Sequence, residues 1–257
     1  MKIKVISVNI WHSHMLPATL EFLQAQNADI VLAQEVSNSS DVALTENFRA
    51  AEHLRAALDM PYMDFAATAL FQYEPAKVDE GLLVLSRFPI KTSTSHYLYG
   101  AYREVNPADP TEWPKMPRSL QHVTLDVQGT ELNVFNLQGV WDLDGDNYSE
   151  QRRTMSQVII EQTHGQPNVI LAGDTNAKPT NPAMKNLEAH LKPVFGDELK
   201  STFNMRRKSN PGYATAAVDL MYVSPNIEVL AKSCPDIDIS DHLPLVVELN
   251  IPDGDSR

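Results

Sequence analysis

The chain has 257 residues, of which 43% are hydrophobic, so it can bury a substantial core, and we expect one domain over residues 1–257. Its net charge of -12 repels polyanions at long range and excludes a broad surface that binds duplex DNA irrespective of sequence. The single cysteine, Cys234, excludes an internal disulfide and favours a reducing, cytoplasmic setting.

The amino-terminal part of the chain predicts strands that alternate with helices. A β-branched run at 3–10 predicts a strand, not a signal peptide, and Asn9 stands near its carboxyl end. Pro17 can begin a helix that ends at 27–29, and the apolar run at 30–33 predicts a strand that carries Glu35 at its end. Helical spacing of apolar residues predicts a second helix at 46–58. Two polar side chains therefore follow two strands at corresponding places.

Short strands dominate the rest of the chain. They are predicted at 62–67, 81–85, 120–127, 132–137, 169–172, 218–223 and 245–249, and residues 128–130 form a hairpin turn. Ser149 can cap a helix that has Met155 and Ile159 in register, while 99–117 is a long connection. Hairpins mixed with strand–helix–strand units suit two packed sheets with helices outside. No apolar run approaches the roughly 18 residues of a spanning helix, so we expect no membrane span.

A series of short polar motifs, most of them next to an apolar run, is the strongest signal in the sequence. In chain order the motifs are SVNIWH, LAQEV, GLLVLSRFPI, VFNLQG, LAGDTNAKP, VDLMYVSP and ISDHLPLVVEL. Together and in this order they resemble the endonuclease/exonuclease/phosphatase family. The resemblance implies a DNase I-like α/β fold, a four-layered sandwich of two packed mixed sheets flanked by helices with the site at the sheet ends. It also implies a metal-dependent hydrolase of phosphate esters, a class that includes phosphodiesterases, nucleases and phosphatases.

Such a hydrolase needs a cation, because the negative oxygens of a phosphate ester repel an attacking water. Hard oxygen ligands suit Mg2+, with Mn2+ as the alternative ion, and Glu35 and Asn9 offer such oxygens. The resemblance implies that Glu35 binds the metal and that Asp241 serves the metal side. A solvated carboxylate at a strand end is the structural alternative for Glu35. Whether one or two metals bind stays open.

The attacking water needs a base and the phosphoryl group needs donors. Asp174 and Asn176 follow Gly173 at one strand end and can supply this base and these donors. A purely structural Asx-turn is the alternative interpretation of the same residues. The resemblance implies that Asp174 orients or deprotonates the water and that Asn176 donates to the phosphoryl oxygens. It further implies that His242 stabilises the developing charge and that Asp219 orients its ring and raises its pKa.

Arg118 and Gln138 are the least certain site residues. Arg118 matches an arginine that contacts substrate phosphate in some family members, and a surface salt bridge is its alternative. Many members carry a histidine where this chain has Gln138, and in nuclease-like members that histidine pairs with a glutamate matching Glu80. Glutamine cannot shuttle a proton, so general-acid help, typically worth about 100- to 10,000-fold in rate, is lost at that position.

Three explanations of Gln138 stay open: proton transfer from a metal-bound water, a good leaving group, or an inactivated enzyme. A non-catalytic phosphate-binding or regulatory module is therefore the alternative function. The substrate is a phosphate ester, and nucleic acid, nucleotide, sugar phosphate and phospholipid headgroup all remain possible classes. The acidic composition favours a substrate smaller than duplex DNA. The sequence does not define the oligomeric state, and a monomer is our working expectation.

Weaker candidates are two basic clusters, at 152–153 and 206–208, which suit solvated faces or local nucleic-acid contacts. The run at 142–147 resembles the start of a calcium loop. It lacks the glycine required at the sixth position, and Arg153 stands where the bidentate glutamate belongs. We interpret it as an acidic turn near the mouth of the site.

Overall fold

The computed structural model describes residues 1–73, 76–142 and 147–252. In these residues the strands form a first sheet in the order β12-β13-β1-β2-β4-β3-β6 and a second sheet in the order β10-β11-β9-β8-β7-β5. The first sheet comprises β1 (Lys2–Asn9), β2 (Ile30–Asn38), β3 (Tyr62–Tyr73), β4 (Ala76–Ser86), β6 (Glu104–Val105), β12 (Glu228–Ser233) and β13 (Leu245–Asn250). The second comprises β5 (Ile90–Tyr99), β7 (Arg118–Val127), β8 (Thr130–Gln138), β9 (Val169–Asp174), β10 (Lys192–Pro193) and β11 (Asp219–Val223).

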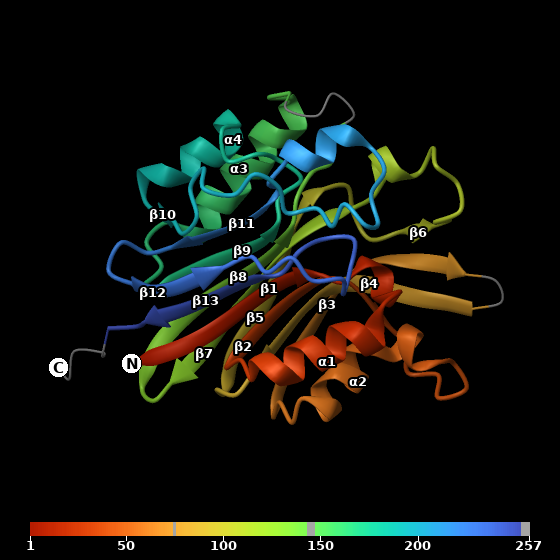
Figure 1. Ribbon diagram of the computed structural model, residues 1–257, viewed down its shortest axis with the longest axis horizontal. Helices are drawn as coiled ribbons and strands as arrows, with labels where there is room; N and C mark the ends of the chain where they lie inside the picture. Colours follow the sequence, from red (N-terminus) through yellow and green to blue (C-terminus); the bar gives the residue numbers. More distant parts are fainter. Residues whose placement is uncertain (74–75, 143–146, 253–257) are drawn as a thin grey trace.

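The two sheets pack face to face, and helices cover their outer faces (Figure 1). Helices α1 (Leu16–Gln26) and α2 (Ala50–Ala57) pack on the first sheet, where Leu23 and Leu54 share a core cluster with Val8. Helices α3 (Glu150–Thr163) and α4 (Pro182–Lys185) lie on the second sheet. The expected four-layered sandwich of two mixed sheets is therefore confirmed.

Alternation along the strands builds the core between the sheets. In β1, Val5 faces the other sheet while Ile6 faces the helices, because successive side chains of a strand point to opposite sides. The same rule applies in β8, where Val134 belongs to the inter-sheet core and Phe135 to the core under α3. Leu132, Ile170, Met221 and their neighbours complete the inter-sheet core.

Polar residues continue these inner faces where the core ends. Two residues apart along each strand, Asn9 follows Ser7 and Val5, Gln138 follows Asn136 and Val134, and Asp174 follows Ala172 and Ile170. The register places Gln138 and Asp219 beside Asp174 on its two sides. Strand pairing thus brings residues that are distant in sequence to one end of the sandwich.

The sequence predicted Glu35 at the end of a strand, but Glu35 lies inside β2. The register between β2 and β4 shifts between Ala33 and Val36, and Glu35 has a positive φ of 54°. This bulge inserts an extra residue and turns the carboxylate of Glu35 away from regular pairing. The predicted strand at 30–33 is consequently the first part of a longer strand.

Other elements also differ from the predictions. The expected helix at 46–58 is a 3-10 turn, Glu46–Arg49, followed by α2, and Arg49 at the junction is not helical. The exposed strands β5 and β12 and the two-residue β6 were not predicted, because largely polar segments show no apolar periodicity. Part of the predicted acidic turn, residues 143–146, lies outside the described residues.

The remaining predicted strands and the helix capped by Ser149 are present, and the Ser149 side chain accepts a hydrogen bond from the Arg152 amide. Among the described residues, no helix combines the length and the apolar composition that crossing a membrane requires.

Candidate active site

A cavity of about 860 Å³ opens at the end of the sandwich where the polar residues gather. Seven of the nine predicted site residues line it: Glu35, Arg118, Gln138, Asp174, Asn176, Asp241 and His242. The other two lie directly behind this lining, since Asn9 contacts Glu35 and Asp219 contacts His242. The structure therefore brings all nine predicted site residues together.

Asn9 links the two sheets at this point. Its amide nitrogen donates to Glu35 Oε1 at 3.0 Å and to Asp174 Oδ2 at 3.2 Å, while its Oδ1 accepts from the Trp11 amide at 3.0 Å. Because Asn9 is fully buried, these bonds compensate the loss of water around its amide. One side chain of the first sheet thus fixes two carboxylates that come from different sheets.

Glu35 is held as an anion by its neighbours. Burial opposes its negative charge, but His12, the hydrogen bond from Asn9, His242 and Arg118 outweigh burial and lower the pKa of Glu35 to about 2. His12 Nε2 lies 3.2 Å from Glu35 Oε2, and Gln138 donates to Glu35 Oε1 at 2.6 Å. At neutral pH this carboxylate is ionised, as binding of a cation requires.

His12 also contacts a second carboxylate. Its Nδ1 lies 2.9 Å from Glu80 Oε1, and Ser37 donates to the other oxygen of Glu80 at 3.0 Å. Burial disfavours the charged ring, yet Glu35 and Glu80 raise the pKa of His12 to about 9. Both ring nitrogens of His12 are therefore used to hold carboxylates together.

Asp174 has a different environment. Burial is the largest influence and Asp219 and Glu35 act with it, so the pKa of Asp174 rises to about 6 even though His242 and the Asn176 amide favour the anion. The Asn176 amide donates to Asp174 Oδ1 at 2.9 Å, which is the Asx-turn considered above. The other oxygen, Oδ2, accepts from the side-chain amides of Asn9 and Asn176.

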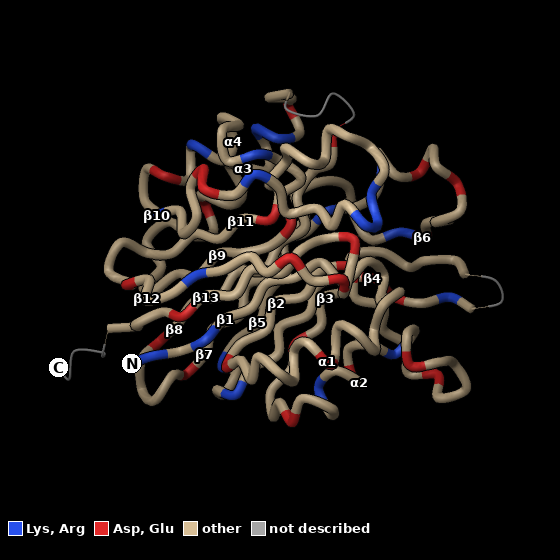
Figure 2. Tube along the Cα trace, viewed as in Figure 1, with Lys and Arg blue, Asp and Glu red and all other residues tan. Residues whose placement is uncertain are grey.

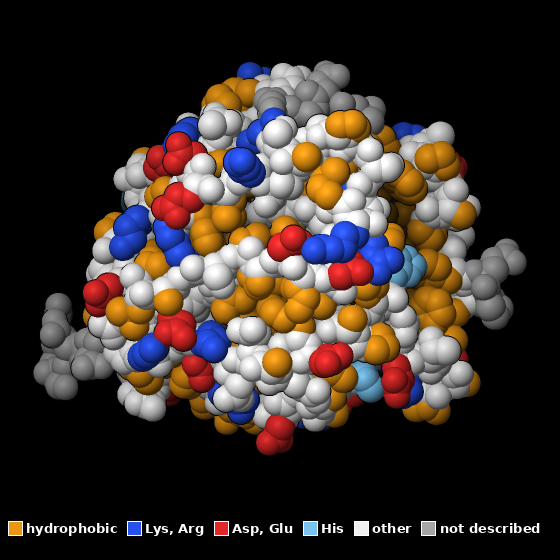
Figure 3. Space-filling model, in the orientation of Figure 1, with side chains coloured by type: hydrophobic (Ala, Val, Ile, Leu, Met, Phe, Trp, Pro, Cys, Tyr) orange, Lys and Arg blue, Asp and Glu red, His pale blue; other side chains and the backbone are white. Residues whose placement is uncertain are grey.

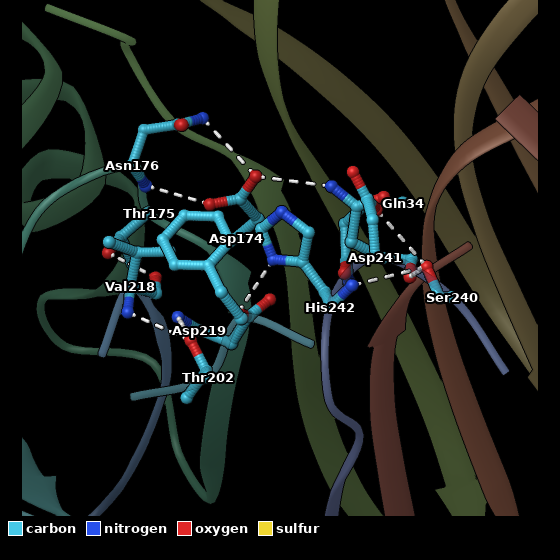
Figure 4. Close-up of polar contacts among 12 residues, drawn as sticks. Gln34, Asp174, Thr175, Asn176, Thr202, Val218, Asp219, Ser240, Asp241 and His242 are labelled. Atoms are coloured by element: carbon cyan, nitrogen blue, oxygen red, sulfur yellow. Dashed lines mark hydrogen bonds and ion pairs between the residues drawn. The ribbon is translucent and has the colours of Figure 1, made fainter. Parts of the chain in front are cut away.

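His242 and Asp219 form a buried pair (Figure 4). His242 Nδ1 lies 2.8 Å from Asp219 Oδ2, and the amide of Asp219 donates to Thr202 Oγ1 at 3.0 Å. Burial lowers the pKa of His242, but the opposite effect of Asp219, Asp174 and Asp241 is larger, and the pKa rises to about 10. The imidazole is consequently protonated at neutral pH, and Asp219 orients it.

Arg118 is a buried cation at the cavity wall. It is only 9% exposed, and within residues 1–73, 76–142 and 147–252 its guanidinium makes no hydrogen bond or ion pair. Burial is the largest influence and lowers the pKa of Arg118, while Glu35 and Asp174 act in the opposite direction. A planar set of donors that lacks protein partners suits an anionic ligand in the cavity.

Comparison with known proteins identifies this arrangement. Residues 6–242 match the sequence profile of the Endonuclease/Exonuclease/phosphatase family. The chain belongs to this family. The match extends from the first strand to His242, so it includes all nine predicted site residues.

Solved structures of family members agree in fold. A protein of the family from Beutenbergia cavernae is 20% identical with a TM-score of 0.74, over 97% of this chain and 72% of that one. A mannosyl-6-phosphatase from Bacteroides thetaiotaomicron is 18% identical (TM-score 0.68), with 97% and 100% of the chains covered. D. rerio TDP2 in complex with a single-stranded DNA product is 16% identical (TM-score 0.70), with 97% and 99% covered. No curated protein sequence matches the chain.

Two groups of residues of this family member can be considered for a metal. Asp174, Asp219 and His242 have potential ligand atoms within 4.8 Å of one another. However, His242 is protonated and its Nδ1 is bonded to Asp219, so it has no free lone pair for a metal on that nitrogen. Glu35 offers anionic oxygen donors and fits a hard cation better, whereas Asn9 directs its amide nitrogen toward Glu35 while its Oδ1 accepts from the Trp11 amide.

The basic cluster 206–208 is neutralised by an acidic segment. Arg206, Arg207 and Lys208 form ion pairs with Asp236, Asp238 and Asp241, respectively, the last at 2.5 Å. Basic and acidic positions are also interspersed along the chain and on the surface (Figures 2 and 3). The positive charges of the cluster are therefore paired within the protein and are not free to bind nucleic acid. One of these pairs joins Lys208 to Asp241, a predicted site residue.

Arg152 of the other basic cluster is buried at the cavity lining and donates to the Asn147 and Asn176 carbonyl groups, so it supports the backbone of the site. His12, the last residue of the motif SVNIWH, was not predicted as a site residue, and Lys208 was considered only as part of the basic cluster 206–208. Their roles depend on contacts with distant segments, and no local motif encodes those contacts.

Proposed function

We propose that the protein is a divalent-metal-dependent hydrolase of phosphate esters that uses an activated water. The observation that carries the proposal is the convergence of three groups on one cavity: the anionic Glu35, the near-neutral base Asp174 and the protonated His242. Asn9 connects the first two through its amide. A cation site, a base and a positive donor together can activate a water and stabilise the charge that develops in phosphoester hydrolysis.

Asp174 is the proposed base. With a pKa of about 6, its carboxylate is largely ionised at neutral pH and basic enough to take a proton from water. His242 donates to a phosphoryl oxygen and stabilises the charge that develops in the transition state. Asn176 and Arg118 line the same cavity and supply further donors to the nonbridging oxygens.

Glu35, with Asn9, is the proposed metal site for Mg2+ or Mn2+, which prefer hard oxygen donors. The carboxylate of Glu35 offers such oxygens, and Asn9 joins it only if its amide turns so that Oδ1, which accepts from the Trp11 amide, faces the cation. When bound, the cation neutralises nonbridging and leaving oxygens. Asp241 lies on the same cavity wall and serves the metal side only if its ion pair with Lys208 opens. Its contribution therefore differs from that of Glu35, whose carboxylate contacts His12, Asn9 and Gln138.

Turnover on a panel of phosphate esters with Mg2+, Mn2+ or chelator tests the proposal. We expect metal-dependent turnover by the native chain, loss of at least about 100-fold in Glu35→Ala, and no change in Glu161→Ala, an exposed glutamate of α3. Calorimetric titration with Mn2+ adds a readout that is independent of turnover. The proposal is wrong if the chelator has no effect, or if Glu35→Ala retains both metal affinity and activity.

The second candidate function is a non-catalytic phosphate-binding or regulatory module. It is favoured by Gln138, whose amide cannot deliver a proton and which donates to Glu35. Under this alternative, the native chain binds phosphate ligands but turns over no ester, and Glu35→Ala is as inactive as the native chain.

The substrate class is proposed on charge and on size. One family member of known structure is named a mannosyl-6-phosphatase and another is bound to a single-stranded DNA product, so small and polymeric esters both have precedent. The net charge of -12 and the neutralised cluster at 206–208 favour a small ester over duplex nucleic acid. We propose a monomer with a small phosphate ester as its partner.

A further inference from the structure

All three tryptophans of the chain line the candidate active-site cavity. Trp11 follows β1, Trp113 lies between β6 and β7, and Trp141 follows β8, so each comes from a different connection. Tryptophan offers a large apolar face, and its rings are most useful where a ligand ring can stack on them. Their convergence on one cavity suggests that a ring enters it.

Further aromatic side chains extend this surface. The rings of Phe71 and Tyr73 on β3 lie 5.9 Å apart, and His12 lies 5.4 Å from Phe71. All three line the cavity, as do the neighbouring side chains of Pro107 and Met116. The first sheet therefore adds aromatic side chains to the cavity beside the carboxylates of Glu35 and Glu80, whereas Asp174 and Asn176 border the cavity from the second sheet.

The backbone is strained where it presents Trp11. Trp11, His12 and Ser13 have φ values of 50°, 50° and 61°, which are unfavourable for residues with side chains. Three consecutive residues of this kind persist only if surrounding contacts maintain them, and such strain concentrates at functional sites. The turn directs Trp11 and His12 to the cavity that holds Glu35.

Two residues that line the cavity, Gln138 and His12, are poor proton donors for a leaving group. The side-chain amide of Gln138 cannot deliver a proton, and it already donates to Glu35 Oε1 at 2.6 Å. His12 cannot protonate a leaving oxygen while both of its ring nitrogens are bonded to carboxylates. A leaving oxygen here must depart without a proton from either residue.

We propose that the substrates are small aryl phosphates, whose aromatic alcohol stacks in this tryptophan-lined cavity and departs unprotonated. This inference rests on the proposed hydrolase function. The volume of about 860 Å³ lies within the range of about 300–1,000 Å³ typical of small-ligand sites. An aromatic ring delocalises the charge of its oxygen, so this class of alcohol tolerates the absence of a proton donor.

The reaction balances without a further reactant. The water oxygen forms a bond to phosphorus, and the bond between phosphorus and the aryl oxygen breaks. Asp174 takes one proton from the water and later returns it to solvent. The aryl oxygen leaves with the bonding electron pair and takes a proton from bulk water, and for a monoester the other product is inorganic phosphate. A nucleotide could also stack its base here, but its ribose oxygen is a poor leaving group without a proton donor.

The test compares 2-naphthyl, phenyl and cyclohexyl phosphate with a nucleoside 5′-monophosphate, in the presence of Mg2+ or Mn2+. The naphthyl and phenyl alcohols have similar acidity, so their comparison isolates ring binding from leaving-group ability. We expect kcat/KM for naphthyl phosphate to exceed that for phenyl phosphate by about tenfold. Cyclohexyl phosphate and the nucleotide should be at least about 100-fold poorer than phenyl phosphate.

Variants assign the ring preference to the cavity. Trp113, which is half exposed at the rim, is changed to Ala to remove the ring and to Phe to restore one. We expect Trp113→Ala to abolish the naphthyl advantage and Trp113→Phe to recover most of it. Tyr62→Ala removes an exposed ring that does not line the cavity and should retain the advantage.

The outcomes separate this inference from the proposed function. Equal rates on aryl and cyclohexyl esters, or a naphthyl advantage that survives Trp113→Ala, overturn the aryl assignment while hydrolysis stands. If no ester is hydrolysed, the proposed function fails, and tryptophan quenching still measures the ring site. Quenching at lower concentrations of naphthyl phosphate than of inorganic phosphate supports that site, and equal or absent quenching rejects it.

Discussion

At the scale of single residues, two carboxylates that share the Asn9 side-chain amide as a hydrogen-bond donor, those of Glu35 and Asp174, have opposite properties. His12, Asn9, His242 and Arg118 overcome burial and hold Glu35 as an anion, whereas burial, Asp219 and Glu35 itself raise the pKa of Asp174. Environments that separate the pKa values of neighbouring acids usually assign them different roles. The difference supports a cation-binding role for Glu35 and a basic role for Asp174.

The pH dependence of kcat/KM tests these roles at a fixed Mg2+ concentration. Below about pH 6 Asp174 gains a proton and cannot accept another, and above about pH 10 His242 loses its positive charge. We expect a bell-shaped profile with limbs near these values. Asp219→Asn removes the main group that raises the pKa of His242, so the alkaline limb should move to lower pH. Asp197→Asn, at an exposed position, is the control, and an unshifted limb in Asp219→Asn would contradict the role of the pair.

Introducing a proton donor is a second prediction for a single residue. Gln138→His should raise turnover of alkyl esters more than turnover of nitrophenyl esters, because only poor leaving groups need protonation. An increase of about tenfold or more in the alkyl-to-nitrophenyl ratio is expected, within the typical range for general-acid help. Steady-state rates on matched pairs of esters measure it, and equal effects on both classes would be evidence against this interpretation of position 138.

The predictability of site residues from sequence follows the nature of their contacts. Asn9, Gln138 and Asp174 continue the alternation of core residues in their strands, so position alone places them at one end of the sandwich. His12 reaches Glu35 and Glu80 through a left-handed turn, and the residue types in that turn do not predict this conformation. The ion pair of Lys208 with Asp241 joins segments 33 residues apart, and residue type alone gives no reason to choose that pair.

At the scale of elements, irregular backbone shapes the site. The left-handed residues Trp11, His12 and Ser13 cost about 1–2 kcal/mol each, as does Glu35 in its bulge. Hydrogen bonds offset part of this cost: Asn47 donates to the Ser13 carbonyl at 2.7 Å, and the Ser37 amide donates to Ser13 Oγ at 3.2 Å. The regular strands therefore form the scaffold, and the strained backbone at 11–13 and at Glu35 orients side chains toward the site.

Gly173 is a test of this close packing between elements. Its φ is 148°, and a Cβ there would lie 2.1 Å from the Leu137 carbonyl oxygen of the adjacent strand. We expect Gly173→Ala to lower the free energy of unfolding by about 3 kcal/mol or more. Gly165→Ala shares a positive φ but meets no atom within 4 Å, so it should cost about 1 kcal/mol. Urea denaturation measures both, and equal losses would show that the contact with Leu137 is unimportant.

The elements themselves were predictable where one face is buried. Strands β1, β8 and β9 carry apolar residues toward the core and were recognised from that pattern. Strands β5 and β12 were missed because most of their side chains are exposed, and only pairing with β7 and β13 makes them strands. Tertiary contacts, and not local propensity, define such edge elements.

At the scale of the whole molecule, one core joins both sheets. Val5 and Leu32 of the first sheet and Leu132 and Ile170 of the second belong to the same buried cluster. Neither sheet can bury its inner face alone, so separation would expose this apolar surface to water. We propose on this basis that residues 1–257 form a single cooperative domain, and the active site depends on it because its residues come from both sheets.

Tryptophan fluorescence can test this cooperativity from both sheets. Variants that retain only Trp11, after β1, or only Trp141, after β8, report on the first and the second sheet separately. We expect coincident urea transitions for the two probes.

Leu132→Ala, at a fully buried position in the second sheet, should lower the free energy of unfolding by about 2–5 kcal/mol for both probes equally. Leu230→Ala, at an exposed position in β12, should change it by less than about 0.5 kcal/mol. A shift seen by Trp141 but not by Trp11 would mean that the sheets unfold independently, and the shared core would then not be what aligns the two halves of the site.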